Sequence, residues 1–209
     1  TVITFSVDTI CNGDATSVTV TSDGTLGTGA KYEWSEDGFA TTRSGDSTNS
    51  ITVSPTTTTT YYARIVGPAP CADVSATVAS ADLIVNDPSV APTSLTSTND
   101  SICNGAATSV TLTANGGTLG TAAVYEWSED GFANVLSSGL DAFINVSPTT
   151  TTTYSVRITG PAPCADVSGT VQTVTVVVTE PSTAPTAVTF STDSICNGYA
   201  TNVTVSVDG

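Results

Sequence analysis

The sequence of 209 residues contains no histidine, no methionine and a single lysine, Lys31. Without histidine, acid–base chemistry near neutral pH has to rely on carboxylates or tyrosine, and a zinc site of the common Cys/His type cannot be assembled. The lack of methionine and the scarcity of lysine remove sites of oxidation and of trypsin-like cleavage. This composition is typical of an exposed, long-lived protein.

Positive charge is also scarce, because 4 Lys and Arg residues stand against 19 Asp and Glu, for a net charge of −15. Such a surface repels nucleic acid and anionic lipid, since binding to phosphates requires cations that replace their counterions. No apolar run approaches the ~20 residues of a membrane span, and no signal peptide is recognisable at Thr1. We therefore expect no nucleic-acid partner and no direct membrane insertion.

The chain repeats itself with a period near 93 residues. DTICNG begins at residue 8, and DSICNG begins at residues 100 and 193; YEWSEDGFA, SPTTTTTY and GPAPCADVS each recur once, 93 residues later. One Trp and two Cys per unit of this length are typical of a small all-β domain in an array. We expect one unit at 1–87, a second at 88–180, and the first part of a third at 181–209, cut from a longer protein.

Comparison of the two copies predicts which strand faces are buried, because outward positions tolerate polar exchanges. Tyr61, Ala63 and Ile65 become Tyr154, Val156 and Ile158, whereas the alternate Tyr62 and Val66 become polar. Strict alternation of this kind indicates a half-buried strand. The same test predicts inward stripes at Tyr32/Trp34, Tyr125/Trp127, Val18/Val20, Val110/Leu112 and Val203/Val205.

Short alternating segments separated by DG, NGG, SP and GPAP turns, with no helical period, predict antiparallel sandwiches. The fold class is thus all-β, with tandem immunoglobulin-like domains. The apolar parity of the last strand changes between Val78 and Ala81 and between Val171 and Val174. We expect a β-bulge or a bend near residues 79–80 and 172–173.

The units are joined by the segments NDPSVAPT (86–93) and TEPSTAPT (179–186). Two prolines in each, Pro88 and Pro92 or Pro181 and Pro185, fix φ and remove backbone donors, so the joint is expected to be short and stiff. An extended rod follows from this.

The five cysteines predict one disulfide within each unit: Cys11 with Cys71, Cys103 with Cys164, and Cys196 with a partner beyond residue 209. Persistent bridges require an oxidising compartment. Because these cysteines flank the strands, the bridge is expected at one pole of the sandwich and not beside the tryptophan. Pairing between units would leave the same odd cysteine but would make each unit depend on its neighbour, and we do not favour it.

Three hydroxyl residues, Thr9, Ser101 and Ser194, follow an aspartate and precede isoleucine at equivalent positions, and Ser47 lies in a similar DST sequence. The pattern resembles the Asp-Ser/Thr-aliphatic motif on which Bacteroidota O-glycosylate exported proteins. It implies O-glycosylation at these four residues. The alternative is that the aspartates and hydroxyls cap turns through local hydrogen bonds.

The acidic turn SEDG follows the tryptophan strand in both copies. Its carboxylates, Glu36 and Asp37 or Glu129 and Asp130, are oxygen ligands that Ca²⁺ accepts, together with Asp87 or Glu180 at the joints. The spacing of a calcium loop is missing, so a solvated acidic turn is favoured and no cofactor is expected. Paired carboxylates also admit glycoside hydrolysis, but a small sandwich offers no deep groove. We expect no enzyme activity.

The segments ITVSPTTTTTYYARI (51–65) and INVSPTTTTTYSVRI (144–158), with their flanking cysteines, carry a resemblance to a family. The units resemble the immunoglobulin-like repeats of very large Bacteroidota surface proteins, including gliding-motility adhesins exported by the type IX secretion pathway. The resemblance implies a secreted, extracellular protein at the outer membrane, with no catalytic residues to assign.

Two functional hypotheses follow. In the first, the chain is part of a stalk or filament that spaces a distal adhesive region from the cell, and its partners are neighbouring repeats and possible surface glycans or surface proteins. In the alternative, each unit binds glycan or Ca²⁺ through its SEDG turn.

Overall fold

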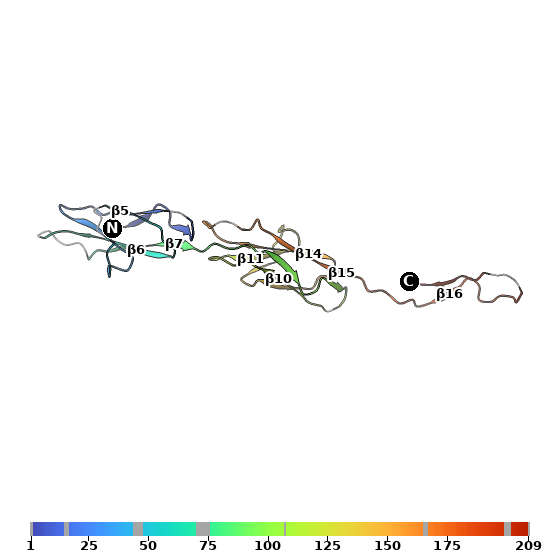
Figure 1. Ribbon diagram of the computed structural model, residues 1–209. Helices are drawn as coiled ribbons and strands as arrows, with labels where there is room; N and C mark the ends of the chain where they lie inside the picture. The colour runs from blue at the N-terminus through green and yellow to red at the C-terminus, as the bar shows by residue number, and fades with distance from the viewer. Residues whose placement is uncertain are drawn as a thin grey trace.

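The computed structural model describes residues 2–14, 17–43, 48–69, 76–106, 108–164, 167–198 and 202–208. Within these ranges every regular element is a β-strand, so the expected all-β sandwich class is confirmed. The same ranges hold no helix that could cross a membrane. Figure 1 shows two bodies of strands placed end to end, followed by a C-terminal hairpin.

The first sandwich packs two sheets with the strand orders β1-β3-β5 and β2-β7-β6-β4. Its opening segment is divided between them: β1 pairs antiparallel with β3, whereas β2 runs parallel to β7. This division of the strands between two sheets is of the immunoglobulin type. The bounds are β1 Ile3–Phe5, β2 Thr9–Cys11, β3 Val18–Ser22, β4 Lys31–Ser35, β5 Ser50–Val53, β6 Thr59–Val66 and β7 Ala79–Asn86.

The second sandwich has the strand orders β13-β10-β8 and β12-β11-β14-β15-β9. Again one short strand, β9, runs parallel to the last strand, β15. The additional strand β12 lies at the edge beside β11. The bounds are β8 Ser94–Ser97, β9 Ser101–Cys103, β10 Val110–Asn115, β11 Val124–Ser128, β12 Ser137–Gly139, β13 Phe143–Val146, β14 Thr152–Thr159 and β15 Gln172–Thr179.

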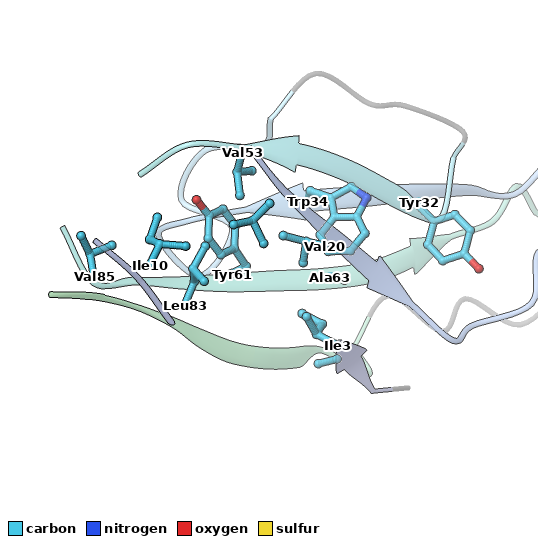
Figure 2. Close-up of a cluster of buried hydrophobic side chains, with 12 residues drawn as sticks. Ile3, Ile10, Val20, Tyr32, Trp34, Val53, Tyr61, Ala63, Leu83 and Val85 are labelled. Atoms are coloured by element: carbon cyan, nitrogen blue, oxygen red, sulfur yellow. The ribbon is translucent and has the colours of Figure 1, made fainter. Parts of the chain in front are cut away.

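Each sandwich has its own hydrophobic core. One cluster draws on residues between Ile3 and Val85, and the other on residues between Leu95 and Val178, with no member in common. In Figure 2 the side chain of Val53 lies near Tyr61, that of Val20 lies near Trp34, and all four belong to the first core. Burying these apolar side chains between two sheets is the main source of stability for domains of this size.

The inward faces predicted from the repeat are confirmed in both sandwiches. Trp34 and Trp127 are each 1% exposed, and Tyr61 and Val156 are equally buried. One position differs: Ser155, predicted to face outward, is buried opposite Ser128 on β11.

The predicted irregularity in the last strand has a simpler cause than a bulge. β7 begins at Ala79 and β15 at Gln172, and their pairing with β6 and β14 is uninterrupted from those residues onward. Val78, which precedes β7, is exposed, whereas Leu83 and Val85 share the buried parity of Ala79. The alternation of apolar residues changes at 79 and 172 because the strands begin at these residues.

The C-terminal hairpin consists of β16 (Val188–Phe190) and β17 (Val205–Val207). Val203 and Val205, predicted to face a core, are exposed. Among the described residues this hairpin has no opposing sheet, so its apolar face is uncovered.

Candidate functional site

The two sandwiches are joined by a disulfide between Cys11 and Cys164, whose Cα atoms lie 4.9 Å apart. The predicted pairs within each unit, Cys11 with Cys71 and Cys103 with Cys164, are therefore wrong. Cys103 and Cys196 are free and exposed. Cys71 lies outside the described residues, and its predicted partner is occupied.

The reason lies in the direction of the strands. Cys103 pairs with Thr179, the last residue of β15. Because β14 runs antiparallel to β15, β14 begins at this same pole of the sandwich. Cys164 follows the turn beyond Thr159, where β14 ends. The eight residues of β14 separate the two cysteines by roughly 25 Å, whereas a disulfide requires Cα atoms within about 7 Å.

Cysteines from neighbouring sandwiches meet instead. Cys11 ends β2 at the pole of the first sandwich that faces the second, and the turn holding Cys164 lies at the facing pole of the second. Figure 1 shows this contact where the blue β2 region and an orange loop of the second sandwich come side by side. The sulfur of Cys164 also lies 3.4 Å from the carbonyl oxygen of Asn86, the last residue of β7.

The linker between the sandwiches, residues 86–93, is hydrogen-bonded to the second sandwich along its length. Val90 and Thr118 exchange both backbone hydrogen bonds, at 2.9 and 3.0 Å. The amide of Thr121 donates to the carbonyl of Asp87 at 3.0 Å, and the Asp87 amide donates to the Thr121 hydroxyl at 2.8 Å. Pro92 is fully buried. The linker thus forms part of the second sandwich.

The start of the linker is also attached to the first sandwich. The side-chain amide of Asn12 donates to the Asp87 carboxylate at 3.0 Å, and the Asn12 backbone amide donates to the Asn86 carbonyl at 2.8 Å. Asp87 therefore contacts both bodies. Together with the disulfide, these contacts make a continuous joint.

Glycine is required where the linker crosses the loop 116–121. A Cβ at Gly120 would lie 2.7 Å from the carbonyl carbon of Pro88 and 2.8 Å from the nitrogen of Ser89, both backbone atoms that could move aside only with a shift of the linker. The equivalent residue of the first sandwich, Gly27, has nothing within 4 Å of its Cβ position. Close approach of two backbones is one of the uses of glycine.

The SEDG turns are closed by their own hydrogen bonds. In the first, the Ser35 hydroxyl accepts from the amides of Asp37 and Phe39, and it donates to the Asp37 carboxylate at 2.7 Å. That carboxylate accepts further bonds from the amide and hydroxyl of Thr41. These donors, the Thr41 amide first, lower the pKa of Asp37 to about 2.

The second turn repeats this arrangement with Asn134 as the main donor, and the pKa of Asp130 is again lowered to about 2. Behind each turn an arginine pairs with a strand glutamate and stacks on a phenylalanine. Arg157 bonds Glu126 and lies 4.1 Å from the ring centroid of Phe132. In the first sandwich Arg64, Glu33 and Phe39 do the same.

The acidic residues predicted as weak calcium ligands are not brought together. Glu36 is paired with Arg43, and the lone pairs of Asp37 and Asp130 are used within their turns. Asp87 and Glu180 bond asparagines at the poles. No cluster of three or more metal-binding side chains occurs among the residues described.

A groove of about 1100 Å³ lies beside the second SEDG turn. Glu129, Asp130 and Asp141 line it, with the half-exposed ring of Phe143 and the hydroxyl-rich segment 149–153. An open surface of hydroxyls, carboxylates and the exposed ring of Phe143 suits polar ligands better than apolar ones. It was not evident from the sequence, because it depends on how the SEDG turn, residues 136–141 and the segment 143–154 come together in space.

The predicted glycosylation residues lie on or near short edge strands. Thr9 begins β2 and is half-buried, whereas Ser101, which begins β9, and Ser194 are exposed. Ser47 lies outside the described residues. The Ser97 hydroxyl donates to the Asp100 carboxylate at 2.7 Å, which is the local capping expected of the alternative. Glycosylation stays a prediction.

Comparisons with known protein families and with characterised proteins give no match. Among solved structures, the chain is similar to the crystal structure of Rst D1-D2, with 17% sequence identity. The match covers 86% of this chain and 99% of that one, with a TM-score of 0.45. A likeness at this level says nothing about function.

Proposed function

We propose that this chain is a structural spacer, a stalk or filament segment of a large repetitive bacterial surface adhesin. In this role it holds a distal adhesive region away from the cell during adhesion or gliding. The proposal starts from the 93-residue repeat and from its resemblance to surface repeats. It has no catalytic component.

The joint between the two sandwiches is the observation that carries the proposal. A spacer has to keep its direction and transmit tension, so successive domains must not rotate freely. A disulfide and a hydrogen-bonded linker both cross this joint. Domains joined by a flexible linker alone would by default move relative to each other.

The net charge and the disulfide both agree with an extracellular location. A net charge of −15 makes copies of the chain repel one another, which favours separate filaments over aggregates. A disulfide at the joint needs an oxidising compartment to form and persist. Secretion to the cell surface, and O-glycosylation of the exposed Ser101, belong to the same proposal.

Replacement of the repeats in the native protein tests the spacer role. Removing residues 88–180 in frame should weaken adhesion, and inserting an unrelated rigid rod of equal length in their place should restore it. The isolated distal region, taken from the deletion strain or from the strain with the rod, should bind its target equally well. If the unrelated rod fails to restore adhesion while surface display is unchanged, the repeats do more than space.

The groove beside Glu129 favours glycan binding as a second candidate function. Its test is calorimetry with oligosaccharides on the 209-residue chain, comparing Phe143→Ser with Leu140→Ser. Both residues are exposed, but only Phe143 lines the groove. Binding heat that disappears only in the Phe143 variant would support this second function. If the chain gives no binding heat, glycan binding is ruled out and the spacer role remains.

A further inference from the structure

The far pole of the second sandwich repeats the bonded pole of the first. Cys103 ends β9 opposite Thr179, as Cys11 ends β2 opposite Asn86. The Asn104 amide donates to the Thr179 carbonyl at 2.8 Å, the same distance as from Asn12 to Asn86.

The side chains at this pole are equivalent as well. The Asn104 side chain donates to the Glu180 carboxylate at 2.9 Å, as Asn12 does to Asp87 at 3.0 Å. An amide and an acid therefore position the start of the linker at both poles. The pole around Cys103 has the geometry that accepts a neighbouring sandwich.

The two poles differ in solvent exposure. Cys11 is 4% exposed and bonded, whereas Cys103 is exposed and free. In the first linker Pro92 is fully buried, but the equivalent Pro185 of the second linker is exposed. These exposed groups are the ones that the first joint buries.

We propose that Cys103 is the attachment site for the GPAP-linked cysteine of a following sandwich of the same sequence. The occupant is a further repeat that follows the second linker, because residues 179–186 lead away from this pole as residues 86–93 lead from the first (Figure 1). The Cys11–Cys164 bond supports this proposal independently of the linker, since it joins the equivalent residues of the first two sandwiches. Each sandwich is thereby bonded to the next.

The bond forms by disulfide exchange with a small-molecule disulfide, such as oxidised glutathione. The Cys103 thiolate attacks one sulfur and releases one thiol, which leaves a mixed disulfide. The thiolate of the incoming cysteine then attacks the Cys103 sulfur and releases the second thiol. The two electrons and two protons lost by the cysteines reside on the two released thiols.

Repetition of this bond gives overlapping covalent loops. The existing loop runs from Cys11 to Cys164, and the proposed loop begins at Cys103, inside the existing one. Tension on the array then always has a covalent path that bypasses part of each sandwich. This inference concerns covalent architecture, and it holds or fails independently of the adhesive or spacer role.

A chain with a completed third sandwich tests the proposal. Residues 117–180 are appended after Gly209, because Gly116 and Gly209 are equivalent in the repeat. The purified chain is oxidised with the glutathione couple, alkylated without reduction and mapped by mass spectrometry. Burial of the appended tryptophan, read from its fluorescence, verifies that the third sandwich has folded.

We expect Cys103 to be linked to the appended copy of Cys164, with Cys196 alkylated. In a Cys103→Ser variant the appended cysteine should become alkylated, whereas Cys196→Ser, the matched control, should leave the map unchanged. Alkylation of Cys103 in the parent chain, or a bond between Cys196 and the appended cysteine, overturns the proposal.

Discussion

Gly120 lies against Ser89 so closely that a Cβ on the glycine would be 2.8 Å from the serine backbone nitrogen. The loop of one sandwich and the linker from the other are thus in direct backbone contact. The hydroxyl of Ser89 accepts a hydrogen bond from the Gly120 amide at 3.1 Å, which fixes the same contact. The orientation of the joint therefore depends on a residue without a side chain.

A Gly120→Ala substitution should open the joint. The added methyl group meets backbone atoms of Pro88 and Ser89, so the linker must shift, at a cost of about 1–3 kcal/mol for overpacking. Amide hydrogen exchange should accelerate at Val90 and Thr121, whose backbone bonds cross the contact. Gly27→Ala is the matched control, because its Cβ has open space. Equal exchange in both variants would contradict the role of Gly120.

Alkylation of the native chain should distinguish the two disulfide patterns. In the 209-residue chain, which lacks the following sandwich, we expect Cys11 and Cys164 to resist iodoacetamide without reduction, and Cys103 and Cys196 to react. Bonds within each unit would instead protect Cys103. In the chain-entropy model, closing a loop over a separation of 153 residues stabilises the pair of sandwiches by roughly 5 kcal/mol. Cys164→Ser should therefore lower the melting temperature, and Cys196→Ser should not.

Single-molecule pulling should show that the disulfide keeps most of the chain from extending under tension. When tension is applied at residues 1 and 209, the bond carries it from Cys11 directly to Cys164, so the intervening segment cannot extend. A separation of 153 residues corresponds to roughly 500 Å of contour length at full extension. Reduction should release this length as two unfolding events. Release of the same length under oxidising conditions would contradict the bond.

The strand faces were predictable from the sequence, whereas the cysteine pairing was not. Alternation decides which of Tyr61 and Tyr62 enters the core, because a strand has only two faces. The pairing of Cys11 depends on which pole each strand end occupies, and spacing along the chain does not report this. One signal was present: a strand of eight residues, Thr59–Val66, lies between Cys11 and Cys71 in sequence.

The joint was only partly predictable. The prolines at 88 and 92 indicate a short linker, but its attachment depends on contacts between separate units. The pairing of Asn12 with Asp87 has no local pattern, since the two residues are 75 positions apart. The closed SEDG turns were also missed. In the first turn Ser35 accepts a hydrogen bond from the Phe39 amide and Asp37 accepts one from Thr41, and Phe39 has a left-handed φ of 71° that its sequence does not indicate.

Stability should be flat between about pH 5 and pH 9, because the chain has no histidine to titrate there. On the acid side, Asp37 and Asp130 have pKa values lowered to about 2 from 3.8. Their contribution is present above the ordinary pKa and is lost as the pH falls toward 2. On the alkaline side, burial raises the pKa of Tyr61 to about 12, so its contribution is lost as the pH rises from 10 to 12.

Melting temperatures measured by circular dichroism across this range should show these two limbs. Asp37→Asn should make the acid limb shallower, because the neutral amide no longer titrates while Asp130 still does. Tyr61→Phe should make the alkaline limb shallower in the same way, because burial also raises the pKa of Tyr154, which remains. A step in the melting temperature between pH 6 and pH 8 would show that a group other than these aspartates and this tyrosine controls stability.

Calcium should produce no saturable heat in calorimetry of the 209-residue chain. Calcium binds a carboxylate through its oxygen lone pairs, and those of Asp130 already accept three hydrogen bonds, from Ser128 and Asn134, at 2.7–3.0 Å. Displacing these donors would open the turn that positions Phe132 and Arg157. Asn134→Ala is the informative variant, since it removes the side-chain donor to Oδ2 of Asp130 and keeps the charge of the carboxylate, while the backbone amide of residue 134 and the Ser128 hydroxyl still donate to Oδ1. If calcium binds the native chain with heat that Asp130→Asn abolishes, the turn is a ligand site and its carboxylate is not committed to Ser128 and Asn134.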